Sequence, residues 1–296
     1  MSRTPVALTI AGSDSGGGAG IQADLKAFAR CGVHGCSAIT AITAQNTLGV
    51  RAIHPVPPDV VLAQVRAVLE DIGVSAVKVG MLGTAPVTLA VARALDELPA
   101  GTPVVVDPVM VAESGARLLD AEAQGALVAE ILPRATVLTP NLPEARVLAG
   151  RQHPLGAAPG EDSEHEGESR QERDVRETSE VHELARAVLA LGPEAVVLTG
   201  GHRARTVDTL LDAAAGELVE IPGEHHPDGT AHGSGCTHSA VLAARLALGD
   251  TILAAATVAR RLAGEAVANG LRELGAGAGP VDVIDLAAQR GGPHVP

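Results

Sequence analysis

Residues 233–237 of this chain read Gly-Ser-Gly-Cys-Thr, which combines two glycines with hydroxyl and thiol side chains. The apolar run over 239–244 indicates that this motif opens a helix. Glycines let a backbone approach a ligand closely, and the free N–H groups of a first helical turn favour a phosphate or a developing oxyanion. Cys236 lies where the helix would also stabilise a thiolate. The motif predicts an anion site that contains a thiol, although a tight turn beside an inert cysteine fits it about equally well.

A second glycine-rich loop, residues 11–20, separates a strand pattern over 6–10 from a helical pattern that begins at Ile21. A strand, a flexible polar loop and a helix in this order are typical of a ligand-binding site. The loop lacks the Gly-x-x-x-x-Gly-Lys-Ser/Thr spacing of a P-loop. The next strand pattern ends in Gln45 and Asn46 rather than in the acidic residue of a dinucleotide-binding fold. Neither common nucleotide fingerprint fits.

The elements that must position these motifs alternate along the chain. We predict strands over 4–10, 37–44, 76–79, 103–106, 136–138 and 195–198, and helices near 20–31, 58–71, 84–97, 121–131 and 180–191. This alternation predicts an α/β fold with a mostly parallel central sheet and helices on both faces. Ligands of such folds bind at the carboxyl ends of the strands. The residues that follow strand patterns there are the glycine loop, Gln45, Gly80, Met81, Asp107, Pro108 and Asn141.

The length of the chain allows one domain or two. A chain of 296 residues that is 46% hydrophobic can bury one large core, and we predict a single domain over residues 1–296. Between about Gly150 and Thr178, Pro, Gly, Ser and charged residues replace apolar periodicity, so we expect a disordered acidic insertion over 150–178. A lid or a partner-binding arm is one interpretation of this insertion, and a solubilising segment is the favoured one.

Charge and composition exclude several classes of partner. The net charge of −13 argues against nucleic acid, which needs a basic face. No run approaches the roughly 20 apolar residues of a membrane span. The amino terminus resembles a core strand rather than a charged leader, so we expect no membrane partner and a cytoplasmic location. The three cysteines lack metal-ligand spacing, so we predict no zinc site and interpret Cys31 and Cys36 as apolar packing residues.

Eight blocks of sequence carry a specific resemblance. They are residues 8–14, 16–26, 44–47, 79–82, 106–110, 139–145, 200–202 and 232–237. In this order they resemble the hydroxymethylpyrimidine/phosphomethylpyrimidine kinases of thiamine biosynthesis, members of the ribokinase-like superfamily. The cysteine at position 236 resembles the pyrimidine-kinase branch of the superfamily, because the sugar kinases usually have an aspartate at this position. The resemblance covers nearly the whole chain and implies a three-layer ribokinase-like fold and an ATP-dependent kinase that acts on 4-amino-5-hydroxymethyl-2-methylpyrimidine and on its monophosphate.

The chemistry of phosphoryl transfer needs an anion cradle, a divalent metal and a group near the attacking hydroxyl. Gly233, Ser234, Gly235 and Cys236 supply the cradle, and Cys236 is the candidate base. The resemblance implies a Mg²⁺ ion organised through water by Asn141 and Glu144, with Asp107 beside them. A helix N-cap with a first-turn acid explains Asn141 and Glu144 equally well, and one helix end can do both.

A side-chain amide suits an aminopyrimidine, because it accepts from the exocyclic amino group and donates to a ring nitrogen. The resemblance places Gln45 in this role and implies a pocket completed by the backbone around Gly12 and Val109, with Asp24 and Met81. Asp24 has a second interpretation, as a helix acid that pairs with Lys26 or the helix dipole.

The scarcity of aromatic residues affects how a ring would be held. The chain has no Trp, no Tyr and only Phe28, so a heterocycle must lie against aliphatic, Met and backbone surfaces. Met81 is the candidate for this contact, and packing in the core is its other interpretation.

The nucleotide-binding residues implied by the resemblance are Thr199, Gly201 and Asn141.

Two positions depart from the family pattern. Family members commonly have a lysine where this chain has Thr199, so a positive charge near the nucleotide phosphates is missing. His238 replaces a usually apolar residue, and we expect it to point away from the anion site.

Two other functions stay open at this stage. A pyridoxal or pyridoxine kinase would also phosphorylate a hydroxymethyl group on a nitrogen heterocycle, but Gln45 favours the aminopyrimidine because pyridoxal offers a phenolic oxygen instead of an amino donor. A non-catalytic sensor of thiamine precursors would keep the pocket, and retention of Asn141, Glu144 and Cys236 argues against it. We also expect a homo-oligomer, specifically a dimer.

Overall fold

The computed structural model describes residues 4–111, 115, 118–151, 170–200 and 206–290. The strands are β1 (Val6–Ala11), β2 (His34–Ile39), β3 (Ala41–Asn46), β4 (Gly49–Pro55), β5 (Ala76–Val79), β6 (Val104–Val106), β7 (Val137–Leu138), β8 (Ala195–Leu198), β9 (Val207–Asp212) and β10 (Leu218–Pro222). Eight of them form one sheet in the order β10-β9-β8-β7-β6-β5-β1-β2, and β3 pairs with β4 separately. Neighbouring strands from β8 to β2 in this order are parallel. Strand β9 is antiparallel to β8, and β10 is antiparallel to β9. The predicted mostly parallel sheet is confirmed.

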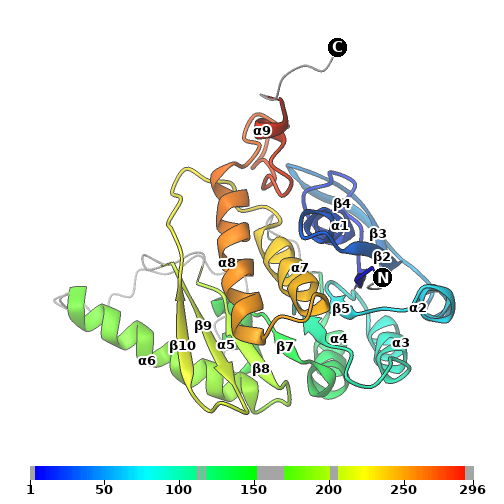
Figure 1. The fold of residues 1–296 in the computed structure, drawn as a ribbon, viewed down its shortest axis with the longest axis horizontal. Helices are drawn as coiled ribbons and strands as arrows, with labels where there is room; N and C mark the ends of the chain where they lie inside the picture. The colour runs from blue at the N-terminus through cyan, green and yellow to red at the C-terminus, as the bar shows by residue number, and fades with distance from the viewer. Residues whose placement is uncertain (1–3, 112–114, 116–117, 152–169, 201–205, 291–296) are drawn as a thin grey trace.

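Helices cover both faces of this sheet (Figure 1). They are α1 (Gly20–Arg30), α2 (Pro58–Asp71), α3 (Ala85–Asp96), α4 (Ala121–Ala126), the π-helical turn η1 (Leu127–Ile131), the 3₁₀ turn η2 (Leu132–Arg134), α5 (Leu142–Leu148), α6 (Arg170–Leu189), α7 (Ser234–Ala247), α8 (Ile252–Ala268) and α9 (Leu286–Arg290). The sheet and its two helical layers give the three-layer architecture that the sequence predicted.

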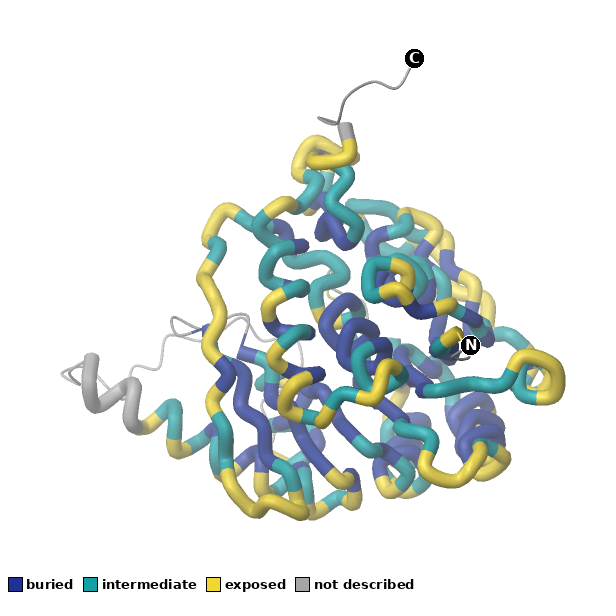
Figure 2. The backbone as a smooth tube through the Cα atoms, in the orientation of Figure 1, coloured by how far each residue is buried: buried dark blue, intermediate teal, exposed yellow. Residues whose placement is uncertain are grey.

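Alternating side chains divide the core into two hydrophobic clusters. On β1, Leu8 and Ile10 join the cluster that contains buried residues of α2, α3 and α6. Ala7 points the other way and joins the cluster of α1, α7 and α8. Figure 2 shows buried residues concentrated in the sheet and in α7. A helix packed this deeply holds its amino terminus at a fixed place beside the sheet.

The structure corrects one predicted strand. The segment 37–44 is divided between β2, in the central sheet, and β3, in the small sheet. The buried Thr40 lies at the division, where its N–H donates to Ala11 O at 3.0 Å and its Oγ1 donates to Met81 O at 2.7 Å. These contacts tie Thr40 to the last residue of β1 and to the loop after β5, and the chain leaves the central sheet there.

Three strands and two helices, β4, β9, β10, α8 and α9, were not predicted from the sequence. The helix expected near 180 begins at Arg170 instead, so residues 170–178 of the expected insertion are helical. Its later turns are anchored by the buried side chains of Val181, Leu184 and Val188. Residues 152–169 of that insertion lie outside the described residues.

None of the helices in the described ranges combines the length and apolar character that a membrane span needs.

Candidate active site

A cavity of about 320 Å³ collects residues that follow β1, β5, β6, β7 and β8, together with the start of α7. The predicted site residues that line it are Gly12, Gln45, Met81, Asp107, Val109, Asn141, Glu144, Thr199, Gly233, Ser234, Gly235 and Cys236. Gly201 lies outside the described residues, and Asp24 does not line the cavity. No Phe, Tyr or Trp is among the described residues of this wall, and Phe28 is a buried residue of α1.

The amino terminus of α7 is open toward a ligand. Gly233 is its N-cap residue, with φ of +85°, and no side chain of the described residues caps this end. A Cβ atom on Gly233 would lie 1.8 Å from the carbonyl oxygen of Gly18, so only glycine fits between the two loops. Helix ends with uncapped N–H groups bind anions. The cradle predicted from Gly-Ser-Gly-Cys therefore lies at a helix end of the kind that binds anions.

The thiol of Cys236 is not a stabilised thiolate in this structure. Burial raises the pKa of Cys236 to about 12; the charge of Lys78 opposes this rise, while Asp107 and Asp24 add to it. The expectation that the helix would favour the thiolate is therefore wrong, because desolvation of the sulfur outweighs the helix terminus.

This pKa predicts how fast Cys236 reacts. We expect the rate of its alkylation by iodoacetamide to rise about tenfold per pH unit from about pH 7 to pH 10, because below the pKa each unit multiplies the thiolate fraction tenfold. Peptide mass spectrometry of the Cys236 peptide measures this rate, and glutathione, whose rate levels off at a lower pH, is the reference. A rate that levels near pH 8.5 would contradict the raised pKa.

Lys78 is a site residue that the sequence analysis missed. It lies on β5 with a fully buried side chain, and it lines the cavity. Its Nζ is 3.0 and 3.1 Å from the two carboxylate oxygens of Asp24 and 3.8 Å from Asp107 Oδ2. Burial alone would lower the pKa of Lys78, but the charges of Asp24, Cys236 and Asp107 outweigh burial and leave it raised. Lys78 thus places a permanent positive charge beside the cradle.

Asp24 has a different role from the one expected. Its carboxylate is fully buried on α1, where it accepts from Thr9 Oγ1 at 2.6 Å and contacts Lys78. Burial raises the pKa of Asp24, and Lys78 counteracts that rise. The prediction that Asp24 contacts the substrate is corrected: Asp24 positions Lys78. The missed signal was a lysine inside the otherwise apolar strand pattern Ala-Val-Lys-Val.

Asn141 and Glu144 form the capping box of α5. Asn141 Oδ1 accepts from the N–H of Glu144 at 2.9 Å, and Glu144 Oε2 accepts from the N–H of Asn141 at 2.9 Å. Burial and then the charge of Asp107 raise the pKa of Glu144 to about 8. Asp107 Oδ2 also accepts from Ser239 Oγ, on α7, at 2.9 Å. Both carboxylates line the cavity.

His238 lines the cavity as well, which corrects the expectation that it points away. Its Nε2 lies 3.0 Å from Asp208 Oδ2, and Arg260 Nε lies 3.7 Å from Asp208 Oδ1. Burial would raise the pKa of Asp208, but His238 and Arg260 outweigh burial and leave it lowered. Asp208 Oδ1 accepts from the N–H of Gly200 at 2.9 Å. The backbone at Gly200 is therefore held by Asp208 of β9, which also contacts side chains of α7 and α8.

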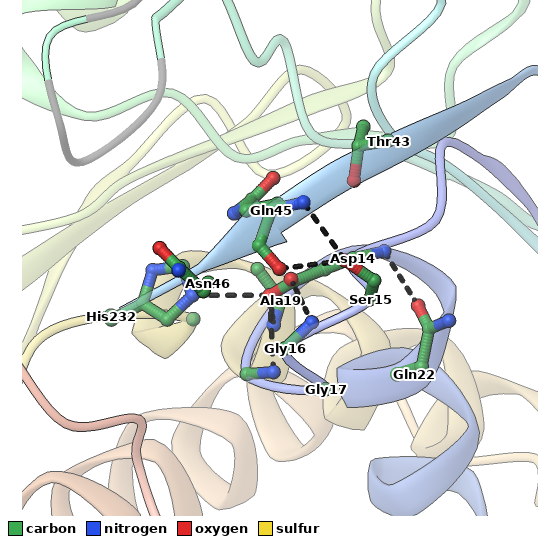
Figure 3. A network of polar contacts seen from close by, with 12 residues as sticks. Asp14, Ser15, Gly16, Gly17, Ala19, Gln22, Thr43, Gln45, Asn46 and His232 are labelled. Carbon is green, nitrogen blue, oxygen red and sulfur yellow. Dashed lines mark hydrogen bonds and ion pairs between the residues drawn. The ribbon is translucent and has the colours of Figure 1, made fainter. Parts of the chain in front are cut away.

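Gln45 lies on β3 above the glycine loop (Figure 3). Ser15 Oγ donates to Gln45 O at 2.6 Å and accepts from Gln45 N at 2.8 Å. Among the described residues, no hydrogen bond engages the side-chain amide of Gln45, which lines the cavity. Met81 Cε lies 2.2 Å from where a Cβ atom on Gly12 would be, so a glycine there makes room for the thioether. The cavity thus has a polar amide beside an apolar methyl group.

Comparison with known proteins adds to this geometry. The sequence profile of the phosphomethylpyrimidine kinase family matches residues 14–159 and 164–282. The hydroxymethylpyrimidine/phosphomethylpyrimidine kinase of Rhizobium meliloti is 44% identical over 279 residues, which cover 94% of this chain and 96% of that protein. The protein of the same name from Haemophilus influenzae is 40% identical over 286 residues, 95% of this chain and 97% of that one.

Solved structures are similar over most of the chain. A phosphomethylpyrimidine kinase from Clostridium difficile is 35% identical, with a TM-score of 0.69 over 87% of this chain and 96% of that chain. A pyridoxal kinase from Staphylococcus aureus in complex with AMP-PCP and pyridoxal is 30% identical, with a TM-score of 0.78 over 96% of this chain and 94% of that chain.

Proposed function

The chain belongs to the phosphomethylpyrimidine kinase family, and we propose that it transfers the γ-phosphoryl group of ATP to the hydroxymethyl oxygen of 4-amino-5-hydroxymethyl-2-methylpyrimidine. It would then phosphorylate the monophosphate to the diphosphate. One observation carries this proposal: a single cavity holds the open amino terminus of α7, Cys236, Lys78 and the free amide of Gln45.

The residues of this cavity have separate roles in the phosphoryl transfer. The hydroxymethyl oxygen forms a bond to the γ-phosphorus, the bond from that phosphorus to the bridging oxygen breaks, and its electron pair stays on ADP. Charge on the transferred group is stabilised by the N–H groups of the cradle and by Lys78, which are fixed before the reaction begins. The hydroxyl proton leaves to the thiolate form of Cys236, which the charge of Lys78 favours and burial disfavours. Because the transition state is loose, this proton moves late, and positioning carries most of the catalysis.

The donor set suits Mg²⁺. No three His, Cys, Asp or Glu side chains cluster as a metal site within the described part of the chain. Mg²⁺ needs no such cluster, since it keeps several waters and binds one or two carboxylates plus phosphates. The repulsion between Asp107 and Glu144 that raises the pKa of Glu144 is what a nearby cation would relieve. We therefore place the ion near Asp107, Asn141 and Glu144, where it would neutralise phosphate charge.

Pyridoxal kinase is the second candidate function. The observation in its favour is the likeness to the Staphylococcus aureus pyridoxal kinase over 96% of this chain. A coupled assay of ADP release, with the aminopyrimidine and pyridoxal in parallel, decides between the two. A larger kcat/KM for the aminopyrimidine supports the proposal, and a larger value for pyridoxal overturns it.

Gln45→Leu tests whether Gln45 binds the pyrimidine ring. A buried donor or acceptor left unpaired costs about 1–3 kcal/mol, so the KM for the aminopyrimidine should rise by about tenfold or more while the KM for ATP changes little. Gln124→Leu, the same substitution on α4 away from the cavity, is the control. Equal changes in both KM values, or no change, would remove Gln45 from the substrate site.

A further inference from the structure

The glycine loop between β1 and α1 is closed by one of its own side chains. Asp14 is 2% exposed, and its carboxylate accepts from the backbone N–H groups of Gly16 at 2.8 Å, Gly18 at 3.1 Å and Ala19 at 2.8 Å. Burial alone would raise the pKa of Asp14, but the hydrogen bonds outweigh burial and leave it lowered. These N–H groups are already satisfied by a charged carboxylate, so this loop is a rigid support rather than a second phosphate cradle.

The same carboxylate reaches the phosphate cradle. Asp14 Oδ2 lies 3.1 Å from His232 Nε2, and His232 immediately precedes Gly233, the N-cap of α7. The backbone of Gly18 also lies against the His232 side chain, because a Cβ atom on Gly18 would lie 2.5 Å from the His232 ring. Figure 3 shows His232 beside the loop that Asp14 closes. The Asp14–His232 pair therefore joins two segments that are 218 residues apart in the chain.

The opposite side of the glycine loop is fixed to β3. Besides the two Ser15–Gln45 hydrogen bonds, Thr43 Oγ1 donates to Ser13 O at 2.8 Å and the N–H of Thr43 donates to Ser13 Oγ at 3.2 Å. An unbroken series of contacts thus runs from Gln45 through Ser15 and Asp14 to His232 and the cradle. It links the residue that would bind the ring to the residues that would bind the phosphate.

From this series we propose that Asp14 and His232 are positioning residues. They hold the glycine loop, residues 11–20, at a fixed position relative to the phosphate cradle. This rests on the proposed function. Phosphoryl transfer needs the attacking oxygen in line with the phosphorus, and a displacement of about 1 Å can cost on the order of 10²-fold in rate. Neither side chain has to touch a reacting atom to have this effect.

Two substitutions of His232 separate positioning from folding. His232→Leu removes the contact with Asp14 at similar volume, whereas His232→Gln keeps a side-chain N–H donor. We expect kcat of His232→Leu to fall about 10²-fold, with KM for ATP and for the acceptor within about threefold of the parent. We expect His232→Gln to recover about tenfold or more of that loss. His34→Leu, the same change at an exposed position on β2, is the control and should keep full activity.

The measurements are kcat, both KM values and the melting temperature of each variant. The parent's own turnover of the aminopyrimidine or pyridoxal tests the proposed function, and the ratio of variant to parent turnover on the accepted substrate tests the positioning role. A kcat of His232→Leu within about threefold of the parent overturns that role. It is also overturned if the loss appears as a higher KM for one ligand, or if a folded His232→Gln is as slow as His232→Leu.

Discussion

Replacing Cys236 with alanine is expected to lower kcat by about 10²-fold or more and to leave the affinities for ATP and acceptor nearly unchanged. In the proposed mechanism the thiolate of Cys236 accepts the hydroxyl proton, and backbone N–H groups that alanine retains bind the phosphate. Steady-state kinetics and calorimetric binding of each ligand measure the two effects separately.

Companion variants distinguish a base from a packing residue. Cys236→Asp should recover part of the rate, because it supplies another base at the same position. Cys31→Ala changes a half-buried cysteine that does not line the cavity, and it should leave kcat at the parent value. Alkylation of Cys236 should inactivate the protein, and ATP with acceptor should protect it. If Cys236→Ala turns over at close to the parent rate, the thiol is only a packing group.

Lys78→Met should be the most destabilising single change at the site. Removing one partner from a buried ion pair typically costs about 3–5 kcal/mol, because the remaining charge is left uncompensated. Here two buried carboxylates, those of Asp24 and Asp107, lose their common cation. We expect a loss of that size in the free energy of unfolding by urea, and a large fall in kcat of the folded fraction.

Lys26→Met is the matched control, since Lys26 is the other lysine of the chain and donates to a single backbone oxygen, that of Gly17. Its cost should stay near the roughly 1 kcal/mol of one hydrogen bond. The double variant Lys78→Met with Asp24→Asn should regain stability, because fewer charges are left unpaired, but not activity. Stability of Lys78→Met within about 1 kcal/mol of the parent would show that the pair is not held as described.

The features that could be predicted from the sequence depend on local pattern. Apolar strand patterns that alternate with helical ones predicted the sheet, and Gly-Ser-Gly-Cys before an apolar run predicted the start of α7. Asn141 and Glu144 were correctly interpreted as a helix cap, because a capping box spans only four consecutive residues.

The features that could not be predicted depend on pairing between distant segments. Lys78 and Asp24 are 54 residues apart, and neither residue's neighbours reveal that both are buried together. The contact of His238 on α7 with Asp208 on β9 likewise joins two distant segments. For Cys236, the helix terminus could be predicted, but the amount of water excluded around the sulfur could not, and this exclusion decided the direction of its pKa.

The wall of this cavity has a spectroscopic consequence. Its described residues include no Phe, Tyr or Trp, and the whole chain contains no Trp, no Tyr and a single Phe. The protein is therefore almost transparent in the near ultraviolet, and any absorption band there belongs to the bound heterocycle. Transfer of that chromophore from water to a surface of methyl, thioether and amide groups should shift its band. Binding can thus be titrated from the spectrum of the unlabelled ligand, and the direction of the shift reports the polarity that the ring meets.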